Sequence, residues 1–106
     1  MRWRRVVVRG PSMSPTVGDG DVVLVRFGAP PATGDVVLVR WSARPEQLSV
    51  KRAVRPEPGG WWVLGDFPEA STDSRMLGVA NVIGVVRFRM WPRPGRLRVL
   101  PPGVSK

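Results

Sequence analysis

The hexapeptide DVVLVR occurs twice in this chain, at residues 21–26 and at 35–40, each time directly after a glycine. A short run rich in Val and Leu between turn residues is typical of a β-strand. Because the apolar centre of the hexapeptide is uninterrupted, we expect both strands to be covered on both faces. Two copies do not make a repeat protein, so the sequence predicts two similar strands joined by the loop FGAPPATG at 27–34.

The rest of the chain has the same short-strand character. Twelve glycines and twelve prolines interrupt it too often for long helices. We expect an all-β fold, a strongly coiled antiparallel sheet or partial barrel, in a single domain spanning 1–106. A polar, loop-like segment with a short helical turn is expected at 66–81, and a Pro/Arg-rich trailing tail at about 92–106. The expected strands are 3–9, 21–27, 35–41, 48–55, 60–65 and 82–90, with a weaker one at 96–100.

The composition argues against a resident metal or other cofactor. The chain has no cysteine and no histidine, so it lacks thiolate ligands and the usual ligands of zinc and copper. Its eight carboxylates are scattered. The stretch GDGD at 18–21 resembles the start of a calcium loop, but the later oxygen ligands and the closing Glu are missing. We therefore interpret GDGD as a hairpin turn and expect no metal or cofactor.

The sequence contains no membrane-spanning stretch, because its longest apolar runs are only a few residues. The N-terminal MRWRRVVVRG is basic but has neither the apolar core nor the cleavage site of a secretory signal. We expect a soluble, cytoplasmic protein without integral membrane association and with at most weak peripheral contact.

The net charge of +9 indicates acidic partners. Arg and Trp interleave in MRWRR at 1–5 and in RFRMWPRPGRLRVL at 87–100. A small basic β-barrel that binds single-stranded nucleic acid has such a face. A solvated surface in an Arg-rich proteome explains the same residues more simply, so nucleic acid is the alternative and not the expected partner.

One serine stands in a context that raises a chemical question. Ser12 lies in RGPSMSPT (9–16), just after an apolar run. To act as a nucleophile it would need a base, which without histidine must be a carboxylate, the N-terminal amine or a lysine with a lowered pKa. Arginine stays protonated in proteins. Of the two lysines, Lys106 is the last residue and Lys51 is in the middle of the expected strand 48–55.

Strand alternation places Lys51 on one face together with Ser49 and Ala53. Such small neighbours would let the amine lie in a dry pocket, where desolvation lowers its pKa. Taken singly, Ser12 has the character of a turn serine and Lys51 that of a solvated strand lysine.

Four stretches taken together are more specific. In order, GPSMSPT, GDVVLV, VKRAV and GDFPEASTDSR resemble the boxes of the signal peptidase I family of Ser/Lys endopeptidases, over roughly residues 5 to 88. The resemblance implies a catalytic domain of the signal peptidase/LexA-like type. It also implies that Ser12 is the nucleophile and that Lys51 is its general base.

Further site residues follow from the same resemblance. Gly10 and the Ser12 N–H would form the oxyanion hole, and Ser71 would orient Lys51. Asp73 and Arg75 would form a supporting ion pair. Asp66 matches the Asp of the family's GDN element as a further supporting residue, although Phe67 replaces the Asn.

The stretches VKRAVRPEPGGWWVLGD (50–66) and GVVRFRMWP (84–92) resemble short members of this type, the nickel-type superoxide dismutase maturation proteases. The resemblance implies that the partner is a precursor with an N-terminal leader, in particular nickel superoxide dismutase, whose metal belongs to the substrate. General signal peptidase I is an alternative, but that family is anchored by spanning helices. The self-cleaving LexA-like peptidases rank lower, because they lack the SxDSR box.

Overall fold

The computed structural model of the protein describes residues 2–100. Its regular structure is almost entirely β-strand, with two short helices late in the chain. In chain order the elements are β1 (Arg2–Val7), β2 (Val22–Phe27), β3 (Val36–Trp41), β4 (Arg44–Glu57), β5 (Gly60–Leu64), the 3-10 helix η1 (Pro68–Ala70), α1 (Ser74–Leu77), β6 (Asn81–Trp91) and β7 (Gly95–Arg96).

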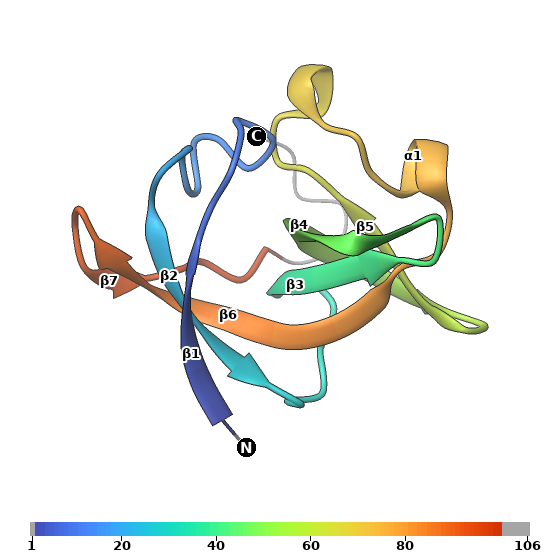
Figure 1. The fold of residues 1–106 in the computed structure, drawn as a ribbon, viewed down its shortest axis with the longest axis horizontal. Coiled ribbons are helices and arrows are strands. Elements are labelled where there is room, and N and C mark those ends of the chain that lie inside the picture. Colours follow the sequence, from blue (N-terminus) through green and yellow to red (C-terminus); the bar gives the residue numbers. More distant parts are fainter. Residues whose placement is uncertain (1, 101–106) are drawn as a thin grey trace.

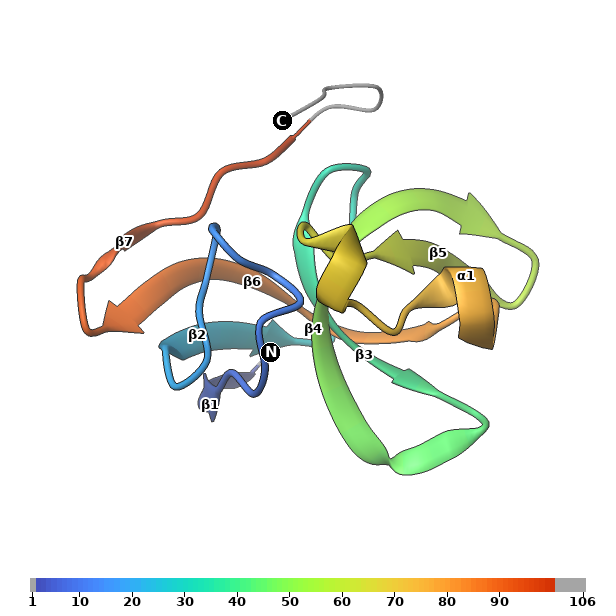
Figure 2. The ribbon, with the colours of Figure 1, turned by 90° about the horizontal axis from the view of Figure 1, so that it is seen from above.

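The strands form one open antiparallel sheet in the order β1-β2-β6-β3-β4-β5, and β7 pairs with β6. The long strand β6 crosses the middle of the molecule (Figure 1). Strands β1, β2 and β7 lie on one side of this crossing and β3, β4 and β5 on the other (Figure 2). The all-β, antiparallel fold expected from the sequence is confirmed.

Two hydrophobic clusters stabilise the sheet, one on each face of β3. Val36 and Leu38 belong to the first cluster, while Val37 and Val39 belong to the second. The second copy of the hexapeptide is therefore covered on both faces, as predicted. The first copy is not, because in β2 only Val23 and Val25 are fully buried. β2 lies next to the edge strand β1, whose residues 2–5 are exposed, so only one face of β2 packs against the core.

Strand β4 is longer than predicted. Its first half, from Arg44 to Leu48, is polar or exposed and pairs with the end of β3 in a hairpin. That half contains Pro45 and shows no apolar alternation, so the hydrophobic pattern revealed only the buried half near Lys51.

Part of the expected tail packs against the domain. The predicted strand 96–100 is reduced to the two residues of β7, but Leu97 after it is buried and its N–H donates to Arg87 O at 2.7 Å. The Leu100 N–H donates to Gly34 O at 3.1 Å. Residues 95–100 are thus part of the fold, and the rest of the expected tail, 101–106, is outside the described residues.

Two loops carry the polar residues singled out above. The loop between β1 and β2 lies beside the segment that links β5 to β6, in both views (Figures 1 and 2). A hydrogen bond of 2.9 Å from Phe67 N–H to Ser12 O joins them. The second loop contains η1 and α1, in agreement with the short helical turn expected at 66–81. Within residues 2–100, no helix is long and apolar enough to cross a membrane.

Candidate active site

Ser12 lies on a turn that a buried methionine anchors. Met13 is fully buried in the first hydrophobic cluster. The Ser14 N–H donates to Pro11 O at 3.0 Å, and the Val17 N–H donates to Met13 O at 3.1 Å. The backbone on both sides of Ser12 is therefore fixed, which restricts where its hydroxyl can point.

The hydroxyl of Ser12 meets the amine of Lys51. Lys51 Nζ lies 2.8 Å from Ser12 Oγ, within hydrogen-bond distance. Lys51 belongs to the buried half of β4 and is only 4% exposed. This distance is compatible with a hydrogen bond in either direction. A protonated Lys51 would donate to the Ser12 hydroxyl, and the Ser12 hydroxyl would donate to a neutral Lys51.

The environment makes the amine of Lys51 easier to deprotonate than that of an ordinary lysine. Burial lowers the pKa of Lys51, because the charged form loses hydration. The Asp73 carboxylate raises this pKa and the Arg75 guanidinium lowers it, and the net direction is downward. A lysine whose pKa is lowered can accept a proton closer to neutral pH than an ordinary lysine can.

Ser71 links Lys51 to a buried carboxylate. Lys51 Nζ lies 3.4 Å from Ser71 Oγ, and the Ser71 hydroxyl donates to Asp73 Oδ2 at 2.7 Å. A continuous chain of polar contacts therefore runs from Asp73 through Ser71 and Lys51 to Ser12. The resemblance implied that Ser71 orients Lys51, and the structure brings Ser71 to the lysine and Asp73 to Ser71.

Asp73 is fully buried, and its surroundings favour the ionised carboxylate. Burial acts to raise its pKa, but hydrogen bonds from the Arg75 side chain, the Gly65 N–H and the Ser71 hydroxyl outweigh burial and hold the pKa at about 2. Arg75 Nε lies 2.9 Å from Asp73 Oδ1, which is the expected ion pair. Arg75 also donates to Pro68 O and Ser71 O, so it ties the whole loop to the carboxylate.

Gly65 allows the two loops to approach each other, and the sequence analysis gave it no role. A Cβ at this position would lie 2.2 Å from Ser71 Oγ and 2.6 Å from Ser12 O. The Gly65 N–H donates to Asp73 Oδ2 at 3.0 Å. Only its place in the GDF stretch beside Asp66 could have drawn attention to it.

Asp66 supports the Ser12–Lys51 dyad through Arg52, the residue that follows Lys51 in β4. It forms a buried ion pair with Arg52, with 2.6 Å between Asp66 Oδ2 and Arg52 Nη2. The Thr16 hydroxyl donates to the same carboxylate. Arg52 also donates to Gly34 O and Arg98 O. Arg52 follows Lys51 in the strand and points to the other face, where it joins the serine loop to residues 95–100.

The model of the Peptidase S24-like family matches residues 5–86. This chain belongs to the Peptidase S24-like family. All seven residues that the sequence analysis assigned to the site lie within the matched range. The match itself supports a serine peptidase-like function and the broader S24/S26 type of family expected from the sequence. No curated protein matches the sequence.

In this S24-like protein, Gly10 does not direct its amide toward Ser12. Its N–H donates to the Asp19 carboxylate at 2.7 Å, and its φ of +81° turns the chain. Among residues 2–100, the Ser12 N–H has no hydrogen-bond acceptor. Pro11 has no N–H. Gly10 and the Ser12 N–H were expected to form the oxyanion hole. Because the Gly10 amide is already engaged, the Ser12 amide is the one of the two that can still donate to an oxyanion.

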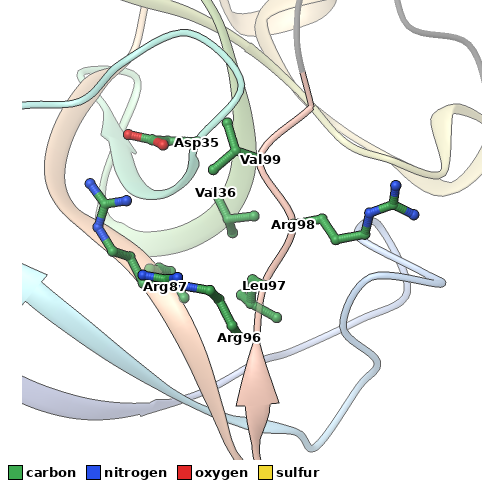
Figure 3. Close-up of a pocket in the computed structure, with 8 residues that line it drawn as sticks. Asp35, Val36, Arg87, Arg96, Leu97, Arg98 and Val99 are labelled. Carbon is green, nitrogen blue, oxygen red and sulfur yellow. The ribbon is translucent and has the colours of Figure 1, made fainter.

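The dyad of this S24-like protein opens onto a groove of about 290 Å³. The end of β1, the serine loop and the first half of β4 line this groove, with Ser12 and Lys51 among the lining residues. A larger cavity of about 500 Å³ is elsewhere and contains neither dyad residue. In that cavity Arg87 and Arg96 point to the same side, while Arg98 points away from them (Figure 3). Within residues 2–100, no three His, Cys, Asp or Glu side chains are grouped as metal ligands would be.

Proposed function

We propose that this S24-like protein is a serine endopeptidase that uses Ser12 as nucleophile and Lys51 as general base. The 2.8 Å contact between Ser12 Oγ and Lys51 Nζ supports this proposal. A serine becomes a useful nucleophile when a neighbouring base within hydrogen-bond reach can take its proton. The lowered pKa of Lys51 supplies that base in a chain without histidine.

The reaction proceeds through an acyl-enzyme. Neutral Lys51 accepts the hydroxyl proton while Ser12 Oγ attacks the peptide carbonyl carbon, and the resulting ammonium protonates the leaving amine. The Ser12 N–H donates to the developing oxyanion, a contact worth ~3 kcal/mol of barrier lowering in serine peptidases. Lys51 then takes a proton from a water molecule as its oxygen attacks the ester carbonyl carbon, and it returns that proton to Ser12 Oγ when the acid product leaves. Ser71 and Asp73 hold the amine in place, and Asp66 supports the serine loop through Arg52.

The substrate we propose is a precursor whose N-terminal leader lies extended in the groove beside the strands. Extended peptides bind alongside exposed β-strands through main-chain hydrogen bonds, and pockets for their side chains give selectivity. Nickel superoxide dismutase is the precursor that the stretches 50–66 and 84–92 favour by resemblance. General signal peptidase activity is the alternative for the same dyad.

Co-expression with a nickel superoxide dismutase precursor tests both the chemistry and the substrate. Mass spectrometry of the dismutase should show loss of the leader with the wild-type chain and an intact leader with Ser12→Ala. The intact mass of the wild-type chain, measured in parallel, reports any self-cleavage. If the dismutase stays unprocessed while a secretory preprotein is cleaved efficiently, the assignment of the Ser12–Lys51 dyad stands and the proposed substrate is wrong.

A further inference from the structure

The groove that contains the dyad carries positive charge only. Apart from Lys51, its charged lining residues are Arg9 and Arg44, and no Asp or Glu lines it. Both arginines are exposed. Within residues 2–100, neither forms an ion pair with a carboxylate. Glu46, two residues after Arg44 on β4, does not line the groove.

The rest of the groove suits a peptide. Val7 and Leu48 are large apolar residues that remain 43% and 47% exposed, one at the end of β1 and one on β4. Leu38 and Val50 form a buried part of the lining. Apolar side chains of a bound peptide would cover these surfaces, whereas the phosphates of a nucleic acid would gain nothing from them.

Building on the proposed endopeptidase, we propose that this groove selects leader peptides that carry Asp or Glu, with Arg9 and Arg44 as specificity-determining residues. Guanidinium groups bind carboxylates through paired hydrogen bonds in a fixed fork. Two unpaired arginines over a groove without carboxylates therefore favour acidic side chains and disfavour basic ones. If the groove recognised leader peptides only through small neutral side chains of the leader, neither arginine would have a role in binding.

The positions of the two arginines predict where the acids lie. Arg9 is three residues before Ser12, and Arg44 is seven residues before Lys51 along β4. An extended chain advances ~3.3 Å per residue, so the stretch of β4 from Arg44 to Lys51 spans up to roughly 23 Å. The chain turns at Gly10, so the three residues from Arg9 to Ser12 span less than the roughly 10 Å of an extended chain. An extended leader would therefore place the acid that meets Arg9 within about three residues of the scissile bond, and the acid that meets Arg44 up to about seven residues from it.

Binding to the inactive Ser12→Ala protein tests the inference without cleavage. The probes are fluorescein-labelled peptides with one common core and a single Asp, Ala or Lys scanned over seven positions on each side of the central bond. We expect the best Asp peptide to bind about fivefold more tightly than its Ala counterpart at low salt. The preference should shrink at high salt, where exposed charges are screened.

Arginine variants in the Ser12→Ala background test whether the preference for Asp arises in this groove. Arg9→Gln and Arg44→Gln should each reduce the Asp-over-Ala ratio at one position of the scan, and the double variant should abolish it. The matched control is Arg93→Gln, an exposed arginine outside the groove, which should keep the ratio. Equal binding of Asp, Ala and Lys peptides, or an unchanged ratio in the double variant, would overturn the inference.

Cleavage by the wild-type protein separates this inference from the proposed function. Cleavage of all peptides with the same kcat/KM would overturn the acid preference and leave the endopeptidase intact. Selective binding of Asp peptides without any cleavage would overturn the endopeptidase and leave the groove as an acidic-peptide site. An oligonucleotide that displaces the Asp peptide and loses affinity in the Arg9→Gln/Arg44→Gln protein would overturn the peptide assignment in favour of nucleic acid.

Discussion

The amine of Lys51 lies 2.8 Å from the hydroxyl of Ser12, although 39 positions separate the two residues in the chain. Lys51 is held by the buried half of β4, and Ser12 by the turn that Met13 anchors. Neither element fixes the distance alone. The contact depends on how the sheet brings β4 against the loop after β1.

Removing either member of this pair should abolish cleavage. Ser12→Ala, Lys51→Ala and Lys51→Arg should each lower kcat/KM by at least about a thousandfold, because nucleophile and base act as a unit. Lys51→Arg belongs in this set because a guanidinium stays protonated and accepts no proton. Peptide cleavage assays measure the loss, and circular dichroism should show an unchanged β-sheet spectrum. Substantial activity in Lys51→Arg would remove Lys51 from the role of base.

The lowered pKa of Lys51 predicts the pH dependence of activity. The neutral amine is the active form, so kcat/KM should rise with pH and reach half its maximum below 10.5, the ordinary value for lysine. The same shift affects folding. Because the unfolded chain holds this proton more tightly, the free energy of unfolding should increase with pH from the folded pKa up to 10.5. A half-maximum at or above 10.5 would contradict the buried, neutral lysine.

The Asp73 carboxylate should stabilise the fold above pH 4. Its pKa is 3.8 in an ordinary setting and about 2 here, which corresponds to about 2 kcal/mol at 1.36 kcal/mol per unit. This contribution is fully present above 3.8 and is lost as the pH falls toward 2. Urea unfolding at pH 7 and near pH 2 should therefore differ less for Asp73→Asn than for wild type.

Activity provides a second readout of Asp73. Its carboxylate raises the pKa of Lys51, so its neutralisation should move the half-maximum of activity to lower pH in Asp73→Asn. Arg75→Ala should cost less stability than Asp73→Asn, because the guanidinium is 42% exposed. If the wild type and both variants have equal stability and equal pH profiles, the loop that contains Asp73 and Arg75 is only a polar turn and does not support the site.

Gly65→Ala should impair catalysis through the backbone. The added methyl would lie within 2.6 Å of Ser71 Oγ and of Ser12 O, so at least one of the two loops must move. We expect a loss of kcat of about tenfold to a hundredfold, since misplacing reacting groups by about 1 Å has effects of that size. The control is Gly95→Ala, where no atom lies within 4 Å of the new Cβ. Full activity in Gly65→Ala would show that the loops accommodate the methyl without disturbing the dyad.

Much of the fold follows from local patterns. Apolar runs between Gly and Pro predict most of the strands, because a strand with a buried face needs Val and Leu at its core positions. The pattern failed where burial is absent. The exposed half of β4, residues 44–48, forms a strand because it pairs with β3 and not because it is apolar. The two DVVLVR copies also differ in burial, on both faces in β3 and on one face in β2, because they have different places in the sheet order.

The sequence by itself determined which residues could perform the chemistry. Without histidine or cysteine, and with Lys51 and the last residue Lys106 as the two lysines of the sequence, few choices of base remain for Ser12. The order of four short stretches then indicated the companions Ser71, Asp73 and Arg75. The first conclusion needs only residue type, and the second is what the resemblance of these stretches to the signal peptidase I family implies.

Only the tertiary structure decided how these residues are used. The lowered pKa of Lys51 requires burial by segments that are distant in sequence, and desolvation depends on all surrounding atoms. The same holds for Gly10, whose amide is engaged by Asp19, and for Asp66, which pairs with Arg52. Hydrogen bonds of this kind join loops that meet only when the sheet coils, so no local pattern encodes them.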